Sequence, residues 1–326
     1  MSRFVGVVYS LIKSHMNRVS NIGLSTTGAL GSLKSFTTDL VSLTKPRVMS
    51  LLLVSTCCPL VLAAGGNVSM NTVWWLLLGG ALVTGSASAI NCIWDRDIDA
   101  IMARTSNRPL AAGRLSVMTA AAFSFIIGTA GLLVLALQLN VHAAAAALLG
   151  HLFYTIIYTV WLKRSTPQNI VIGGAAGAIP PLVGWVAATG SINLTAFLIF
   201  MVVFLWTPPH FWALALNKNE DYQKAGVPMM PVVAGRTSTH NQMLLYALSL
   251  IPVTILLVLS DANLGAFSMI LLVALATIFA FKNYQLKCIG DVDSPEHTKK
   301  AWDVFGFSLI YLSLFFACLV IDSTLL

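Results

Sequence analysis

Two polar stretches interrupt this otherwise apolar chain, and both begin with an Asn-x-x-x-Asp pattern. The first runs from Asn91 through Asp95 to Asp99, and the second from Asn217 to Asp221. Residues four apart in a helix stack about 6 Å apart along one face, so Asn91, Asp95 and Asp99 would share a stripe. Like charges at this spacing repel each other, and we therefore expect a cation among them.

Oxygen ligands suit a hard cation, and Mg²⁺ commonly takes one or two carboxylates while leaving positions for water and substrate phosphate. The alternative is that these acids form a solvated helix end neutralised by nearby arginines. Two acidic clusters at matching helix ends favour the metal, and a diphosphate is the implied ligand. The predicted metal ligands are Asn91, Asp95, Asp99, Asn217 and Asp221.

Basic side chains near these acids can balance the charge of a diphosphate. Arg104, Arg108 and Lys218 are predicted to do so, because Arg grips phosphate oxygens with two parallel hydrogen bonds. Other loop cations lie away from an acidic stripe and are predicted to anchor the chain at the membrane surface. These are Lys163, Arg164, Lys282, Lys287, Lys299 and Lys300.

The elements that must position these residues are membrane helices. Of the 326 residues, 57% are hydrophobic and only 10% are charged, which excludes a soluble enzyme, a disordered chain and a disulfide scaffold. Apolar windows about 20 residues long are sufficient to cross a bilayer, and they predict an all-α bundle. The nine predicted spans cover roughly residues 47–64, 73–93, 117–138, 141–161, 169–188, 194–213, 243–260, 264–281 and 302–321.

The basic residues predict how this bundle sits in the membrane. All 19 Lys and Arg residues precede the first span, open it, or lie in alternate connections. Because positive residues stay on the cytoplasmic side, we expect the N-terminus inside and the C-terminus outside. Residues 1–40 are predicted to be a poorly ordered cytosolic extension of the membrane domain, 41–326. Mitochondrial targeting is the alternative for this Ser- and Thr-rich segment.

The net charge of +7 does not indicate a nucleic-acid partner. The basic residues are dispersed between apolar runs, and the sequence contains no aromatic and basic binding module. The five cysteines have neither the even count of a disulfide framework nor the paired spacing of a zinc site. Membrane lipid is therefore the expected surrounding.

Further motifs accompany the first acidic stripe in a fixed order along residues 40–321. One opens the first span, one follows the first stripe, one ends the sixth span, and the last contains the second acidic cluster. They are Leu43-Thr-Lys-Pro-Arg47, Arg104-Thr-Ser-Asn-Arg108-Pro-Leu, Trp206-Thr-Pro-Pro-His210-Phe-Trp, and Asp221-Tyr222 with Pro228-Met-Met-Pro.

Together these motifs resemble the UbiA-type intramembrane prenyltransferases, and among them the branch that farnesylates heme. The resemblance implies a nine-helix bundle whose cavity opens to the cytoplasm and binds an isoprenyl diphosphate through Mg²⁺. By the family pattern, Asn91, Asp95 and Asp99 form the first metal and diphosphate motif, and Asp221 belongs to the second. Many members have Asp where this chain has Asn217, whose neutral amide can still coordinate Mg²⁺ or hydrogen-bond phosphate.

The same resemblance implies the reaction and its setting. The farnesyl group of farnesyl diphosphate would pass to a vinyl group of heme B, and water would then add. His210 is predicted to contact heme or handle a proton. We expect a bacterial inner membrane, with a mitochondrial one as the alternative, and a downstream heme-modifying enzyme or terminal oxidase as a partner. The predicted apolar slot is lined by Trp94, Trp206, Phe211, Trp212 and Tyr222.

Two other functions compete with this interpretation. A sister prenyltransferase of quinone biosynthesis, with an aromatic acceptor, would share the acidic motifs and the bundle. A transporter would instead need charges along a path through the membrane, whereas here the charges gather at one face. The sequence therefore favours an enzyme over a transporter.

Overall fold

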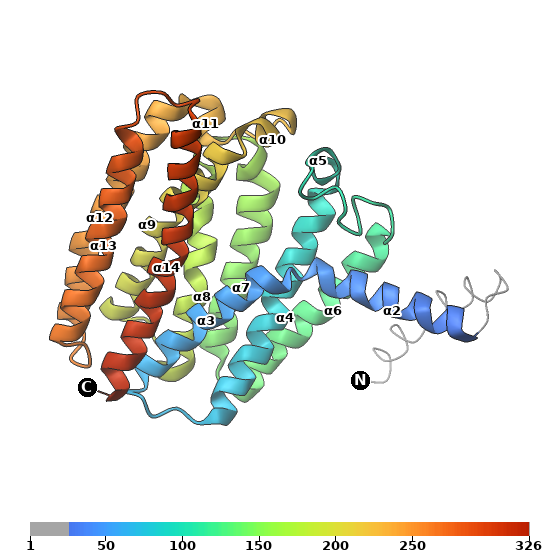
Figure 1. The fold of residues 1–326 in the computed structure, drawn as a ribbon. Coiled ribbons are helices and arrows are strands. Elements are labelled where there is room, and N and C mark those ends of the chain that lie inside the picture. Colours follow the sequence, from blue (N-terminus) through green and yellow to red (C-terminus); the bar gives the residue numbers. More distant parts are fainter. Residues whose placement is uncertain (1–25, 326) are drawn as a thin grey trace.

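The structure, a computed structural model, describes residues 26–325 as an all-helical bundle, with no strand in that range (Figure 1). Nine helices in this part of the chain are long and apolar enough to cross a membrane, as the sequence predicts. They are α3 (Pro46–Ala63), α4 (Met70–Trp94), α6 (Val117–Gln138), α7 (Val141–Leu152) continued by η1 (Phe153–Trp161) and η2 (Leu162–Arg164), α8 (Asn169–Thr189), α9 (Leu194–Asn217), α12 (Gly235–Ser260), α13 (Ala266–Lys287) and α14 (Pro295–Leu325).

The predicted spans are confirmed in number and order, but two helices begin earlier than their apolar windows. Helix α12 starts at Gly235 and α14 at Pro295. Polar residues occupy these first turns, where His240 and His297 are buried against each other. An apolar window cannot detect a helical turn whose polar side chains are satisfied by a neighbouring helix.

Several spans begin with a side chain that caps the helix. Ser69 and Ser116 accept hydrogen bonds from the backbone N–H groups three residues later, at 3.1 and 3.0 Å. Asn140 and Asn193 do the same at 2.8 and 3.0 Å. The first N–H groups of a helix have no partner within it, so these caps fix where the spans start.

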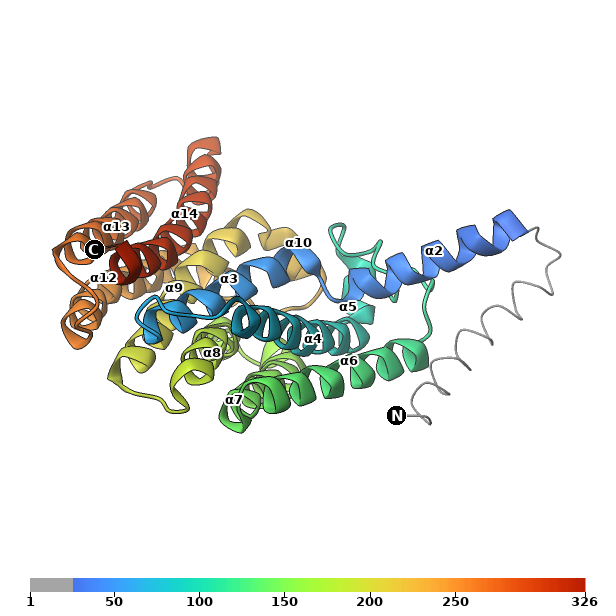
Figure 2. The ribbon, with the colours of Figure 1, turned by 90° about the horizontal axis from the view of Figure 1, so that it is seen from below.

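Helix α2 (Thr26–Leu43) precedes the first span and extends away from the bundle (Figure 2). It includes residues 26–40 of the segment for which the sequence predicts poor order, and that prediction stays a prediction. The ion pair between Arg114 and Asp39, at 3.1 Å, ties α2 to the connection that leads into α6. Residues 1–25, the rest of the predicted extension, lie outside the described residues.

Three short helices lie together at one end of the bundle (Figure 1). They are α5 (Arg96–Ile101), α10 (Asn219–Lys224) and α11 (Met230–Val233). Helix α5 follows α4 and α10 follows α9, so the two polar stretches of the sequence reach the same end of the molecule. The bundle therefore brings both predicted acidic clusters to one face.

Glycine allows α3 and α8 to cross with their backbones in contact. A Cβ atom added to Gly184 of α8 would lie 1.7 Å from the carbonyl oxygen of Thr56 in α3. Small residues at such crossings let membrane helices approach closely, where packing rather than the hydrophobic effect holds them together. These two helices also border the internal cavity, so their spacing sets its width.

We expect Gly184→Ala to destabilise the bundle by about 3 kcal/mol, because the new methyl group meets backbone that cannot move aside. Thermal unfolding of the purified protein in detergent, followed by tryptophan fluorescence, measures this. Gly177→Ala is the matched control, since a Cβ there would have no heavy atom within 4 Å. Equal unfolding midpoints for the two variants would contradict the proposed backbone contact.

Candidate active site

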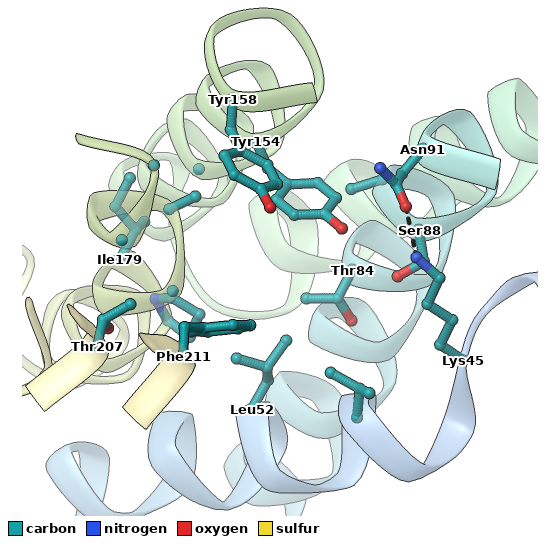
Figure 3. A pocket seen from close by; sticks show the side chains of 18 of the residues that line it. Lys45, Leu52, Thr84, Ser88, Asn91, Tyr154, Tyr158, Ile179, Thr207 and Phe211 are labelled. Carbon is teal, nitrogen blue, oxygen red and sulfur yellow. Dashed lines mark hydrogen bonds between the residues drawn. The ribbon is translucent and has the colours of Figure 1, made fainter. Parts of the chain in front are cut away.

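A cavity of about 420 Å³ lies inside the bundle, and both polar stretches contribute residues to one end of it, which we call its mouth. Residues of α3, α4, η1, α8 and α9 form its walls, and the segments after α5 and α10 contribute at its mouth. Apolar side chains such as Leu52, Ile179 and Phe211 line its depth, whereas Asn91 and Lys45 stand at its polar side (Figure 3). The cavity therefore combines an apolar slot with a charged rim.

Two tyrosines project into the cavity from a π-helical segment. Tyr154 and Tyr158 belong to η1, and their rings stack with centroids 5.6 Å apart (Figure 3). A Cβ atom on Gly173 would lie 2.2 Å from the ring of Tyr158, so this glycine is what allows the ring to pack there. π-helical turns are rare and occur often at functional sites. No motif in the sequence singles out these tyrosines.

Lys45 and Asn91 join the start of α3 to the end of α4. The Lys45 ammonium donates a hydrogen bond to Asn91 Oδ1 at 2.5 Å (Figure 3). Burial lowers the pKa of Lys45. With φ of 51°, Lys45 is the one non-glycine residue among residues 26–325 in the left-handed region. Such a conformation costs about 1 kcal/mol or more and persists where its surroundings hold it, as at binding sites.

Asp95 is fully buried directly behind the cavity wall. Its Oδ2 atom accepts a hydrogen bond from the Asn91 amide at 2.7 Å and pairs with Lys163. Its Oδ1 atom lies 3.6 Å from a guanidinium nitrogen of Arg164 but has no hydrogen-bond partner. Asn91 and Lys163 both line the cavity, so Asp95 acts on the site through them.

Asp99 lines the cavity itself and pairs with Arg108 at 2.6 Å. Burial acts to lower the pKa of Arg108, but the carboxylate of Asp99 outweighs it and the pKa is raised. Asp97 points away from the cavity, and the hydrogen bond from Arg164 lowers its pKa to about 2. Of the three acids in the first motif, Asp99 lines the cavity, Asp95 is buried behind its wall and Asp97 is exposed at the surface.

The second polar stretch reaches the cavity through Tyr222 rather than through its acid. Tyr222 lines the mouth beside Arg104; burial raises its pKa, whereas the charge of Arg104 acts to lower it. Asn217, Lys218 and Asp221 are not among the described residues that line the cavity. Asn217 instead donates to the carbonyl oxygen of Ala213 at 3.1 Å. Their predicted roles stay predictions.

Of the five aromatic residues predicted to line a slot, Trp206, Phe211 and Tyr222 do line the cavity. Trp94 and Trp212 do not: Trp94 is 43% exposed on the outside, and Trp212 is buried against Tyr246. Neighbouring residues in a helix point to different faces, and the sequence pattern alone did not show which of these aromatic side chains face the cavity. His210 lies in the cavity wall beside Trp206.

Two cations of the site were not identified from the sequence. From the sequence, Lys163 is predicted to be a membrane anchor, but its ammonium pairs with Asp95 at the site. Lys45 was noted only as part of a motif. Neither lysine lies at helical spacing from the carboxylate or amide that it contacts, so no local pattern connects them. The one available signal was that buried acids require cationic partners.

The oxygen atoms at the mouth are of the kind that Mg²⁺ prefers, but in the structure they contact cations of the protein. Asn91 Oδ1 accepts from Lys45, and Asp99 pairs with Arg108. The Oδ1 atom of Asp95 is buried without a hydrogen bond, 3.6 Å from a guanidinium nitrogen of Arg164. Within residues 26–325, no group of three or more His, Cys, Asp or Glu side chains is arranged to hold a metal by itself.

Fold and site together define a helical membrane protein with a deep apolar cavity under a polar, charged mouth. The model of the UbiA prenyltransferase family matches residues 51–319, and the chain belongs to this family. The protoheme IX farnesyltransferase of Acaryochloris marina is 46% identical over 285 residues, or 87% of this chain and 86% of that protein. That of Gloeobacter violaceus is 46% identical over 88% of this chain and 92% of its own length.

Solved structures share the fold at low sequence identity. A structure of digeranylgeranylglyceryl phosphate synthase has a TM-score of 0.70, with 17% identity over 89% of this chain and 99% of that one. A UbiA homologue from Archaeoglobus fulgidus, bound to DMAPP and Mg²⁺, has a TM-score of 0.65 and 18% identity. It covers 86% of this chain and 99% of its own. These likenesses confirm the predicted all-helical membrane fold.

Replacing Lys163 by Met should destabilise the protein by about 3–5 kcal/mol, because it leaves the buried charge of Asp95 without its ammonium partner. Adding Asp95→Asn to that variant should restore most of the loss, since the charge is then removed. Thermal unfolding in detergent measures both effects. The control is Lys224→Met at an exposed pair with Glu220, where the change should stay within about 0.5 kcal/mol. An unchanged midpoint in Lys163→Met would refute the buried pair.

Proposed function

We propose that the chain is a protoheme IX farnesyltransferase, or heme O synthase. It transfers the farnesyl group of farnesyl diphosphate to a vinyl group of heme B, and addition of water gives heme O. The names of the relatives support this acceptor over an aromatic acid of quinone biosynthesis. The observation that carries the proposal is an apolar cavity that ends in a cluster of cationic side chains.

The polar end of this cavity suits a diphosphate. Lys45, Arg104, Arg108 and Lys163 all line it, so four cationic side chains surround the place where the anionic head would lie. Diphosphate leaves an allylic carbon only when its developing charge is stabilised, and fixed cations in a water-poor site do this strongly. The apolar depth of the cavity accepts the farnesyl tail.

Mg²⁺ would be held by the oxygens of Asn91, Asp95 and Asp99, with water and the diphosphate completing its coordination. Oδ1 of Asp95 has no hydrogen bond, but it lies 3.6 Å from a guanidinium nitrogen of Arg164 behind the cavity wall, so Mg²⁺ would have to replace that ion pair to reach it. When bound, the metal neutralises charge on the leaving group. Asn217 and Asp221 belong to the proposed second motif, and Lys218 is its proposed cation.

The chemical step follows from this arrangement of residues. The bond between the farnesyl C1 carbon and oxygen breaks, and diphosphate leaves with both electrons toward Arg104 and Arg108 at the cavity mouth. The vinyl carbon of heme attacks the allylic cation and leaves a positive charge next to the porphyrin. Water adds there and releases a proton, which gives a hydroxyethylfarnesyl group. The apolar walls, with Tyr154 and Tyr158, keep water from the first cation.

The proposed setting is a bacterial inner membrane with the cavity mouth toward the cytoplasm, the N-terminus inside and the C-terminus outside. The basic loops support it, because the positive residues gather at the end that carries α5 and α10. A product this apolar would pass to another membrane protein, and a downstream heme-modifying enzyme or terminal oxidase is the proposed recipient.

We expect Asp99→Asn to lower heme O formation about 100-fold or more, because the site loses a carboxylate that the metal and Arg108 both need. Mass spectrometry of pigments extracted from membranes that express each variant measures the product. Asp303→Asn is the control: this acid pairs with Lys282 outside the cavity and should retain activity. Full activity in Asp99→Asn would refute the site. Unchanged hemes with altered quinones in the wild type would favour the aromatic acceptor.

Native Cys288 reports the orientation without an added tag. It is the exposed cysteine of the five, and it follows α13 at the end that carries α10. A membrane-impermeant maleimide should label it in inside-out vesicles and not in intact spheroplasts. Cys288→Ser should abolish the label, because the other four cysteines lie within membrane helices. Labelling in spheroplasts alone would reverse the proposed topology.

A further inference from the structure

The imidazole ring of His210 is held rigidly in the wall of the cavity. Trp206, one helical turn earlier in α9, stacks on one side with ring centroids 4.3 Å apart and planes 18° apart. Phe305 of α14 also stacks on the ring, at 4.8 Å and 22°. With both faces of the ring in contact, only its edges are available to other groups.

Ser308 fixes the tautomer of His210. Ser308 Oγ lies 2.5 Å from the carbonyl oxygen of Phe305, and two oxygens at that distance need a hydrogen between them. The single hydroxyl hydrogen of Ser308 is therefore donated to Phe305. The contact of 2.6 Å between His210 Nδ1 and Ser308 Oγ must then use a hydrogen on Nδ1.

A neutral imidazole that carries its hydrogen on Nδ1 has a bare lone pair on Nε2. Among the described residues, Nε2 of His210 has no hydrogen-bond partner. The atom is not fully buried, and His210 lines the cavity. Metal-ligating histidines show this arrangement: the other ring nitrogen donates to an oxygen, which sets the orientation of the ring and raises its basicity.

The second histidine of the cavity wall differs. His151 uses Nε2 in a contact of 3.0 Å with Ser86, and its remaining nitrogen, Nδ1, is enclosed without a partner. Both histidines line the cavity, but only His210 offers a nitrogen that a ligand in the cavity can reach. His151 is therefore a matched control for the chemistry of His210.

We propose that Nε2 of His210 is an axial ligand of the iron in the heme substrate, and that Ser308 is its positioning residue. The inference rests on the proposed function, because it takes heme as the substrate. His210 lies seven residues before Asn217, the end of α9, roughly 10 Å along the helix axis. Iron ligation at that depth fixes the porphyrin below the charged mouth and leaves its edge free to turn toward the prenyl diphosphate.

The test is a titration of purified wild-type protein with ferric protoheme, without any prenyl diphosphate, followed by absorption and electron paramagnetic resonance. The wild type should show histidine-ligated heme. His210→Ala should lose that signature and bind heme about 100-fold more weakly, and Ser308→Ala about 10-fold more weakly. Added imidazole should restore the signature in His210→Ala. His151→Ala should leave it unchanged.

Iron-free protoporphyrin IX separates ligation from folding, because it has the same shape but no metal to bind. His210→Ala should bind it as tightly as the wild type does. A wild-type spectrum in His210→Ala, or equal losses of affinity for heme and protoporphyrin, would overturn the proposal. Loss of heme O formation with an unchanged heme spectrum would make His210 a proton acceptor instead. If the wild type ligates heme iron through His210 but makes no heme O, the proposed function would be refuted and the proposed iron ligand would be retained.

Discussion

The structure depends on neutralising charges that are buried at the edge of the membrane. Asp95 is fully buried and Asp99 almost so, and an ionised carboxylate in such surroundings is costly unless a cation contacts it. Lys163 and Arg108 supply those contacts from other parts of the chain. The same charges make the site useful, because a cluster of cations and carboxylates held in place before substrate arrives needs little rearrangement to receive an anionic head and its metal.

This network also connects the site to the helices around it. Lys45 brings in the start of α3, Asn91 the end of α4, and Lys163 the end of the fourth span. The π-helical segment η1 shifts the register of that span, and its tyrosines face the cavity in Figure 3. A helix without this segment would present different residues to the cavity. The π-helical geometry of η1 and the charge pairs of Lys45 and Lys163 thus shape the same site.

The apolar part of the cavity is shaped by small residues as much as by large ones. Gly173 makes room for Tyr158, and Gly184 lets α3 approach α8. On the far wall, α14 contributes Phe305 and Ser308 to the surroundings of His210. Residues nearly one hundred positions apart therefore determine which nitrogen of one histidine faces the cavity, and with it the chemistry that this wall can perform.

Hydropathy and charge along the sequence determined the membrane helices and their order, because crossing a bilayer requires long apolar runs whatever their neighbours are. The spacing of Asn91, Asp95 and Asp99 indicated a polar motif at a helix end, since four residues make about one turn. The tertiary structure alone decided that Asp95 lies behind the wall, that Lys163 and Arg164 are its cationic partners, and that Tyr222 rather than Asp221 lines the mouth. These outcomes depend on contacts between distant segments and on the rotation of each helix about its axis, which no local pattern encodes.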